Sequence, residues 1–254
     1  MLPRMDEAAE RFLRERGVSA EVFRTEPGTR GRLTEETRAA LRTLEGPGGR
    51  SGRLSPLTYN LTVSHRHHFV WFRVAKVATR TVLTYYLQHD VPLDLVAARR
   101  IRYPTALWAG YYKFSFVRHP QARFLSAWRD KVVDQNYFDF DEPTLAAMQD
   151  PSAFLAWTAG HDLDDLGPTD QHLAHQTRLV DLSQVDYLGR LETFEADFAA
   201  ICARLDLPAP AAGHQNQTRG GARPIDARLA GAIHEVYRKD FQVLGYPAPE
   251  RDRS

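Results

Sequence analysis

The stretch Lys113-Phe114-Ser115-Phe116-Val117-Arg118-His119-Pro120 passes from an apolar run directly into charged residues and a proline. The apolar run over Tyr111 to Val117 predicts a buried strand. Pro120 is typical of the first turn of a helix, which we expect to continue to about Asp134. A guanidinium at a strand end, followed by the free N–H groups of a helix start, favours binding of an anion. The stretch therefore predicts a strand, a phosphate-binding turn and a helix. Arg118, and Ser126 eight residues later in the expected helix, are the candidate phosphate ligands.

A second basic turn lies upstream, in Phe72-Arg73-Val74-Ala75-Lys76-Val77-Ala78-Thr79-Arg80-Thr81. We expect a buried strand over His67 to Val74 and a helix over Thr79 to Gln88. The turn contains none of the glycines of a nucleotide P-loop, so a triphosphate site of the usual form is disfavoured. The chain has only 4 lysines against 29 arginines, which makes Lys76 a distinctive choice at this position.

The remaining pattern alternates strands with helices. Further elements are expected over Pro151 to Ala159 (helix), Pro168 to Val180 (helix or loop), Val185 to Leu191 (strand), Glu192 to Leu205 (helix) and Ile225 to Phe241 (closing helix). Such alternation predicts an α/β sheet that is mostly parallel, with ligands at the carboxyl ends of its strands. Both basic turns lie at such ends. We divide the chain into a helical N-terminal extension and linker, 1–57, and one domain, 58–254.

Composition narrows the function classes. A net charge of +1 over 254 residues gives no general reason to expect nucleic acid or an acidic membrane as partner. A single cysteine, Cys202, excludes an intramolecular disulfide and a cysteine-based zinc site. No apolar stretch approaches the roughly 20 residues of a membrane-spanning helix. The N-terminus lacks an apolar signal core. We therefore expect a cytoplasmic protein.

Together the two basic turns resemble the carbohydrate sulfotransferase family, in the branch that uses 3′-phosphoadenosine-5′-phosphosulfate (PAPS). Val74–Thr81 is similar to the family's 5′-phosphosulfate loop, and Lys113–Lys131 is similar to its 3′-phosphate segment. Three later stretches also resemble family elements and follow in the same order: Asp170–Gln176, Tyr187–Phe198 and Tyr237–Tyr246. The resemblance runs from about residue 65 to 247. It departs from the family pattern at three positions: Ala75 replaces Pro, Thr79 replaces Cys or Gly, and Arg80 replaces Thr or Ser.

The resemblance implies a P-loop-like three-layer sandwich with a central, mostly parallel sheet flanked by helices. It implies PAPS as donor, PAP as product and no required metal. Lys76 is then expected to stabilise the leaving phosphate, and His172, oriented by Asp170, to act as the base. The expected donor-binding residues are Arg73, Lys76, Val77, Ala78, Thr79, Arg80, Thr81, Arg118, Ser126 and Arg219.

Several alternatives remain at this stage. His175, His89 and Asp170 compete with His172 as the base. The pair His172 and His175, or the cluster His65–His68, is an alternative metal-ligating set. The chain can also be interpreted as a P-loop-type small-molecule kinase, or as a non-catalytic relative that holds PAP, PAPS or a sulfated glycan.

The acceptor has no readable motif. A carbohydrate hydroxyl, or the hydroxyl of a glycosylated small molecule, is the expected partner, and homo-oligomer formation is left open. Trp128, Trp157 and Tyr137 are either sugar-stacking or core-packing aromatics.

Overall fold

The structure is a computed structural model that describes residues 55–106, 108–211 and 225–249. Residues 1–54 of the extension predicted over 1–57, and the candidate phosphate ligand Arg219, lie outside the described residues. At the start of the described chain, Ser55 is fully buried, and its hydroxyl accepts a hydrogen bond from the backbone N–H of Tyr103 at 3.0 Å.

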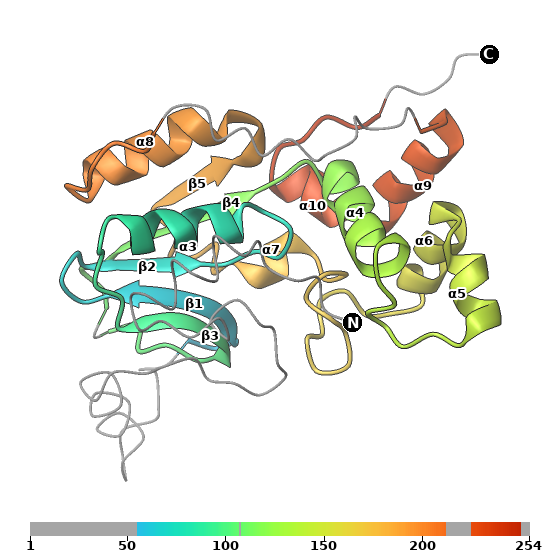
Figure 1. Cartoon of the computed structure of the whole chain (residues 1–254), viewed down its shortest axis with the longest axis horizontal. Helices are drawn as coiled ribbons and strands as arrows, with labels where there is room; N and C mark the ends of the chain where they lie inside the picture. Colours follow the sequence, from blue (N-terminus) through green and yellow to red (C-terminus); the bar gives the residue numbers. More distant parts are fainter. Residues whose placement is uncertain (1–54, 107, 212–224, 250–254) are drawn as a thin grey trace, which may run out of the picture.

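Within the described residues, five strands form one sheet in the order β3-β1-β2-β4-β5 (Figure 1). The strands are β1 (Tyr59–Ser64), β2 (Phe69–Phe72), β3 (Leu95–Ile101), β4 (Tyr112–Val117) and β5 (Tyr187–Arg190). The pairs β2–β4 and β4–β5 are parallel, whereas β1 is antiparallel to both β2 and β3. Only β1 therefore runs against the other four strands, and the predicted, largely parallel α/β sheet is confirmed.

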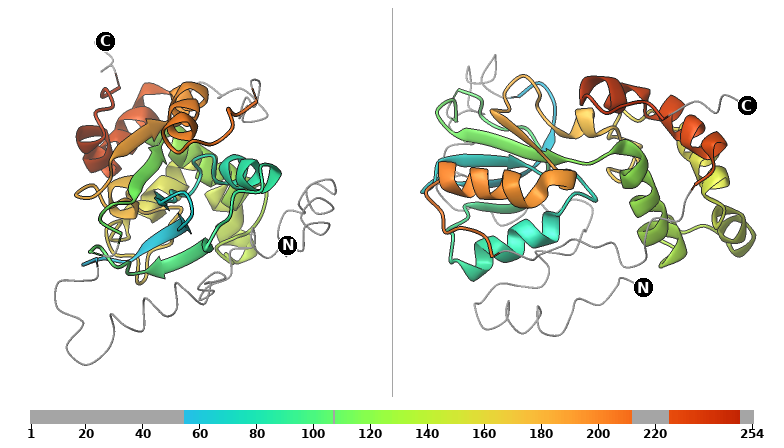
Figure 2. Two further views of the ribbon diagram at one scale, coloured as in Figure 1. Left: turned by 90° about the vertical axis from the view of Figure 1, so that its left-hand side faces the viewer. Right: turned by 90° about the horizontal axis from the view of Figure 1, so that it is seen from above.

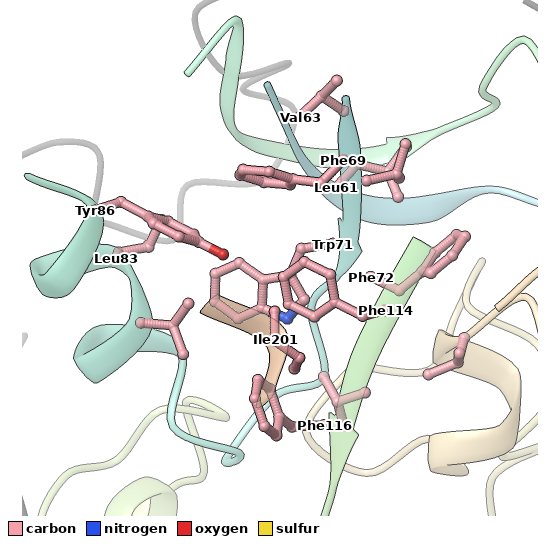
Figure 3. Packing of buried hydrophobic residues seen from close by; sticks show 14 of the residues in the cluster. Leu61, Val63, Phe69, Trp71, Phe72, Leu83, Tyr86, Phe114, Phe116 and Ile201 are labelled. Atoms are coloured by element: carbon pink, nitrogen blue, oxygen red, sulfur yellow. The ribbon is translucent and has the colours of Figure 1, made fainter. Parts of the chain in front are cut away.

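Apolar side chains cover both faces of the sheet. On one face, helices α3 (Thr79–Gln88) and α8 (Phe194–Arg204) pack on the strands, and Tyr86 stacks on Phe69 with ring centroids 5.3 Å apart. Phe72 points to the opposite face, where its ring meets that of Tyr103 edge to face with centroids 5.6 Å apart. Figure 3 shows this alternation along β2, with Trp71 and Phe72 pointing to opposite sides of the strand. The alternation follows from the two-residue period of a strand.

A group of helices lies beyond one end of the sheet, next to the point where β4 runs into α4 (Figures 1 and 2). Its members are α4 (Pro120–Trp128), α5 (Glu142–Met148), α6 (Pro151–Ala159), α9 (Ala227–Val236) and α10 (Arg238–Val243). Phe124, Phe154 and Tyr237 are buried in its own apolar cluster. Trp157 stacks on Phe154 at 5.6 Å, and Trp128 Nε1 donates to the Met148 carbonyl at 3.0 Å. Both tryptophans therefore pack among the helices.

The structure corrects several sequence-based boundaries. The helix expected from Pro120 to about Asp134 ends at Trp128, and the chain continues as a π-helical turn, Arg129–Val133. The closing helix expected over Ile225 to Phe241 is divided at Tyr237 into α9 and α10. Strands β1 and β3 were not predicted. In contrast, α3 and α6 have the predicted bounds.

Candidate active site

The loop between β2 and α3 holds Lys76 in an uncommon backbone conformation. Lys76 and Ala78 have φ angles of 69° and 48°, in the left-handed region where residues other than glycine are rare. Such strain persists only where surrounding structure imposes it, and it clusters at functional sites. Val77, between the two, is buried and anchors the loop in the core. The Thr79 hydroxyl donates to the Val74 carbonyl at 3.3 Å, so it supports the loop itself.

Helix α3 begins in this loop without a side-chain cap. Ala78 is the N-cap residue and makes no side-chain hydrogen bond, and the first turn of α3 contains no acidic residue. The first N–H groups of a helix have no partner within the helix and carry a partial positive charge. The start of α3 therefore favours an anion beside Lys76. Arg80, in the first turn, is exposed.

Lys76 is paired with a carboxylate from the π-helical turn after α4. Lys76 Nζ lies 3.0 Å from Asp130 Oδ2, and Lys131 Nζ lies 3.2 Å from the same oxygen. The Lys76 and Lys131 side chains are only 18% and 9% exposed. Burial lowers the pKa of Lys76, and the Asp130 carboxylate partly opposes that shift. For Asp130, burial raises the pKa, but the two ammonium groups outweigh it and lower the pKa overall. The cluster has two cations for one anion.

His172 and Asp170 form a buried pair. His172 Nδ1 lies 2.6 Å from Asp170 Oδ1, and the Tyr137 hydroxyl donates to Asp170 Oδ2 at 3.0 Å. The Tyr137 and His172 rings meet edge to face with centroids 5.2 Å apart. Although burial disfavours an ionised Asp170, its hydrogen bond and charge interaction with His172 hold the pKa of this carboxyl well below its usual range. Asp170 is therefore an acceptor, and Nδ1 of His172 carries the hydrogen.

The protonation state of His172 suits a general base. Burial lowers the pKa of His172, Asp170 opposes that shift, and the charges of Lys131 and Lys76 lower the pKa further. The imidazole is therefore neutral near pH 7, with its hydrogen on Nδ1. The lone pair on Nε2 is left as the proton acceptor.

A continuous series of contacts joins the two predicted catalytic residues. Lys76 contacts Asp130, Asp130 contacts Lys131, and Lys131 Nζ stands 4.2 Å above the Tyr137 ring, which leads through Asp170 to His172. Residues from the loop after β2, the turn after α4 and the segment just before helix α7 (Gln176–Leu179) thus meet in one place.

Arg118 lies at the carboxyl end of β4, the parallel neighbour of β2, so it shares a sheet edge with the Lys76 loop. The side chain of Gln176, the first residue of α7 (Gln176–Leu179), holds the Arg118 backbone twice. Gln176 Oε1 accepts from Arg118 N at 2.9 Å, and Nε2 donates to Arg118 O at 2.8 Å. The fully buried carboxylate of Asp240 accepts in turn from the backbone N–H of Gln176 at 2.8 Å and of Thr177 at 3.0 Å. Ser126 lies in the last turn of α4, four residues before Asp130.

The alternative bases occupy other surroundings. His175 Nδ1 lies 3.2 Å from Asp164 Oδ1, and its Nε2 lies 3.4 Å from the Val236 carbonyl oxygen. His89 is exposed at the end of α3 opposite the Lys76 loop, with its ring 4.4 Å from that of Tyr85. In the part of the chain that the structure describes, no three His, Cys, Asp or Glu side chains group as metal ligands would. Over the same residues, no helix has the length and apolarity of a membrane span.

The sequence profile of the sulfotransferase family matches residues 59–247. The chain belongs to this family. Members of the family use PAPS as donor. Carbohydrate sulfotransferase 12 of Mus musculus is 26% identical over 175 residues, and its Xenopus laevis counterpart is 26% identical over 174 residues. Each alignment covers 55% of this chain and 41% of the relative, so the chain spans less than half the length of these relatives. No solved structure matches the chain significantly.

Several residues that organise this sulfotransferase site had no role in the sequence-based interpretation. They are Arg123, Asp130, Lys131, Gln176 and Asp240. All five lie in stretches that resemble the family. The resemblance marks these stretches as important but does not indicate what each residue does. The role of Asp130 and Lys131 depends on the π-helical turn, which brings both consecutive side chains into the site. Such turns inside helices occur frequently at functional sites.

Proposed function

We propose that this sulfotransferase moves the sulfuryl group of PAPS to a hydroxyl of a carbohydrate or a glycosylated small molecule and releases PAP. The observation that carries the proposal is the contact series from Lys76 to His172, at the sheet edge that also holds Arg118. This cluster supplies a positively charged anion-binding site and, beside it, a neutral base. Both aligned relatives are named as carbohydrate sulfotransferases, which supports a sugar acceptor.

The charges fit a phosphosulfate. Two ammonium groups, on Lys76 and Lys131, face a single carboxylate, and the uncapped start of α3 adds N–H donors. In the proposal, Arg118 and Ser126 receive the 3′-phosphate at the neighbouring strand end. A guanidinium suits a two-pronged contact with phosphate oxygens.

The proposed reaction is an in-line transfer. The acceptor oxygen forms a bond to sulfur while the bond from sulfur to the bridging phosphate oxygen breaks, and that oxygen keeps the electron pair. Lys76 stabilises the negative charge that develops on the leaving phosphate. His172 Nε2 takes the proton of the acceptor hydroxyl, and Asp170 stabilises the resulting imidazolium through Nδ1–H.

The test is an assay with PAPS and a panel of free sugars, oligosaccharides and glycosylated small molecules. We expect equal amounts of PAP and a sulfated product, detected by mass spectrometry, and loss of both with Lys76→Ala or His172→Gln. Lys239→Met is the matched control, because this lysine forms an exposed ion pair with Asp164 at 2.8 Å.

Thermal melting separates the alternatives, because a ligand that binds only the folded state raises Tm. PAP binding without product from any acceptor would favour a non-catalytic binding protein. Stabilisation by ATP with magnesium, but not by PAP, would favour a kinase.

A further inference from the structure

The guanidinium of Arg123, on α4, makes three hydrogen bonds to backbone carbonyls next to the site. Nε donates to the Ala75 carbonyl at 3.1 Å, Nη1 to the Ala174 carbonyl at 2.8 Å, and Nη2 to the Gln171 carbonyl at 2.8 Å. The side chain is 1% exposed. Its bonds therefore join two separate segments of the chain through the interior of the protein.

Each of these segments carries a proposed catalytic residue. Ala75 immediately precedes Lys76, and the bond from Arg123 holds the carbonyl just before the left-handed turn at Lys76. Gln171 and Ala174 flank His172 on both sides. One rigid, planar group thus sets the distance between the segment that presents the ammonium and the segment that presents the imidazole.

We propose that Arg123 is a positioning residue that fixes Lys76 and His172 relative to each other. This inference rests on the proposed function, because it assigns Arg123 to the geometry of that reaction. A buried cation is costly unless its donors are satisfied, and here neutral backbone carbonyls satisfy the guanidinium from three directions. Lysine cannot reproduce the arrangement, since a single ammonium cannot reach all three carbonyls from one point.

The first test compares Arg123→Met and Arg123→Lys with a matched control, Arg178→Met. Arg178, on α7, also bridges segments through carbonyls, from Nε to Asp164 at 3.0 Å and from Nη1 to Thr58 at 3.1 Å. For both Arg123 variants we expect kcat to fall about 100-fold, the loss associated with a misplacement of about 1 Å. The donor KM should change far less, because the Arg118 end is untouched. Arg178→Met should lower Tm without a matching loss of kcat.

A merely structural role gives a different pattern. In that case kcat would follow Tm equally in all three variants, or Arg123→Lys would restore wild-type kcat, and either result would overturn the inference.

Two further readouts need no turnover. In the wild-type protein, nitrogen-detected NMR should show the four Nη protons of Arg123 as separate, slowly exchanging signals. One averaged, fast-exchanging signal would refute the positioning role of Arg123, even if the variants fail to fold. In Arg123→Lys, the His172 imidazole should titrate closer to the ordinary value of about 6.5, because its segment opens to water. If the wild type neither binds PAP nor forms product, the proposed function fails, while these two measurements still decide the role of Arg123.

Discussion

Lys76 Nζ lies 3.0 Å from Asp130 Oδ2 and shares that oxygen with Lys131 Nζ at 3.2 Å. The carboxylate neutralises part of the charge that an anionic donor would use. Asp130 is 28% exposed and lies in the π-helical turn directly after α4. Any anion that reaches Lys76 must compete with Asp130 for both ammonium groups and is repelled by its charge.

Asp130→Asn should therefore tighten binding of PAP. We expect Kd to fall about tenfold, or about 1.4 kcal/mol, because the competing charge is removed while an amide of the same size remains. Isothermal titration calorimetry measures the change. Glu195→Gln, on the exposed face of α8, removes the same charge away from the site and should leave Kd unchanged. An unchanged or larger Kd in Asp130→Asn would contradict the competition.

The two ends of the proposed donor site should separate in kinetics. Lys76→Ala should lower the single-turnover rate on the order of 100-fold or more, because its ammonium faces charge that grows in the transition state. Its effect on PAP affinity should be smaller. Arg118→Ala should mainly weaken donor binding. Donor titrations combined with single-turnover rates check both, and the reverse pattern would refute the role assignment.

Asp240→Asn should weaken the site from a distance. The buried carboxylate accepts from the backbone N–H of Gln176 and Thr177, and Gln176 in turn holds both backbone groups of Arg118. An amide at this position presents a donor where three donors already point inward, the two N–H groups and the Thr177 hydroxyl, and an unsatisfied buried donor costs about 1–3 kcal/mol. Thermal melting should show a lower Tm, and PAP titration should show a higher Kd. Asp150→Asn, at the exposed cap of α6, should leave Kd unchanged.

The sequence predicted those parts of the fold that local patterns encode. Helix α3 follows an apolar strand and has a regular apolar face, so its bounds were predicted to the residue. The antiparallel strands β1 and β3 were missed. The pairing of β1 with β3 joins residues that are far apart in the chain. It is also irregular, with a register shift between Leu61 and Val63, so no regular local pattern in the sequence indicates it.

The candidate site shows the same limit. His172 and His175 lie three residues apart in one segment, and composition does not separate them. The structure does, because His172 pairs with Asp170 beside Tyr137, whereas His175 lies against Asp164. The contact of Lys76 with Asp130 is likewise a product of tertiary packing.

The pH dependence of the proposed reaction follows from the lowered pKa of His172. Burial, together with the charges of Lys131 and Lys76, holds this pKa below 6.5. The neutral form is the base, so kcat/KM should rise with pH through a midpoint below 6.5 and then level off. Initial rates between about pH 4.5 and 8 test this. A midpoint above 6.5, or an unchanged profile in His172→Gln, would exclude His172 as the base.

Donor binding should change that midpoint in a known direction. The phosphate groups of PAP would neutralise Lys76 and Lys131, the two charges that lower the pKa of His172. Asp170 would continue to raise that pKa. The pKa of His172 should therefore rise on addition of PAP, and the midpoint of kcat should lie above that of kcat/KM, since the former reports the bound enzyme. NMR titration of the imidazole with and without PAP measures the shift directly. Lys131→Met should raise the pKa of His172 in the free protein and reduce the shift of that pKa on addition of PAP, because one of the two charges is already absent. If PAP binds and the His172 titration does not move, the anion and the base are not coupled through these lysines, and the contact series between them is structural only.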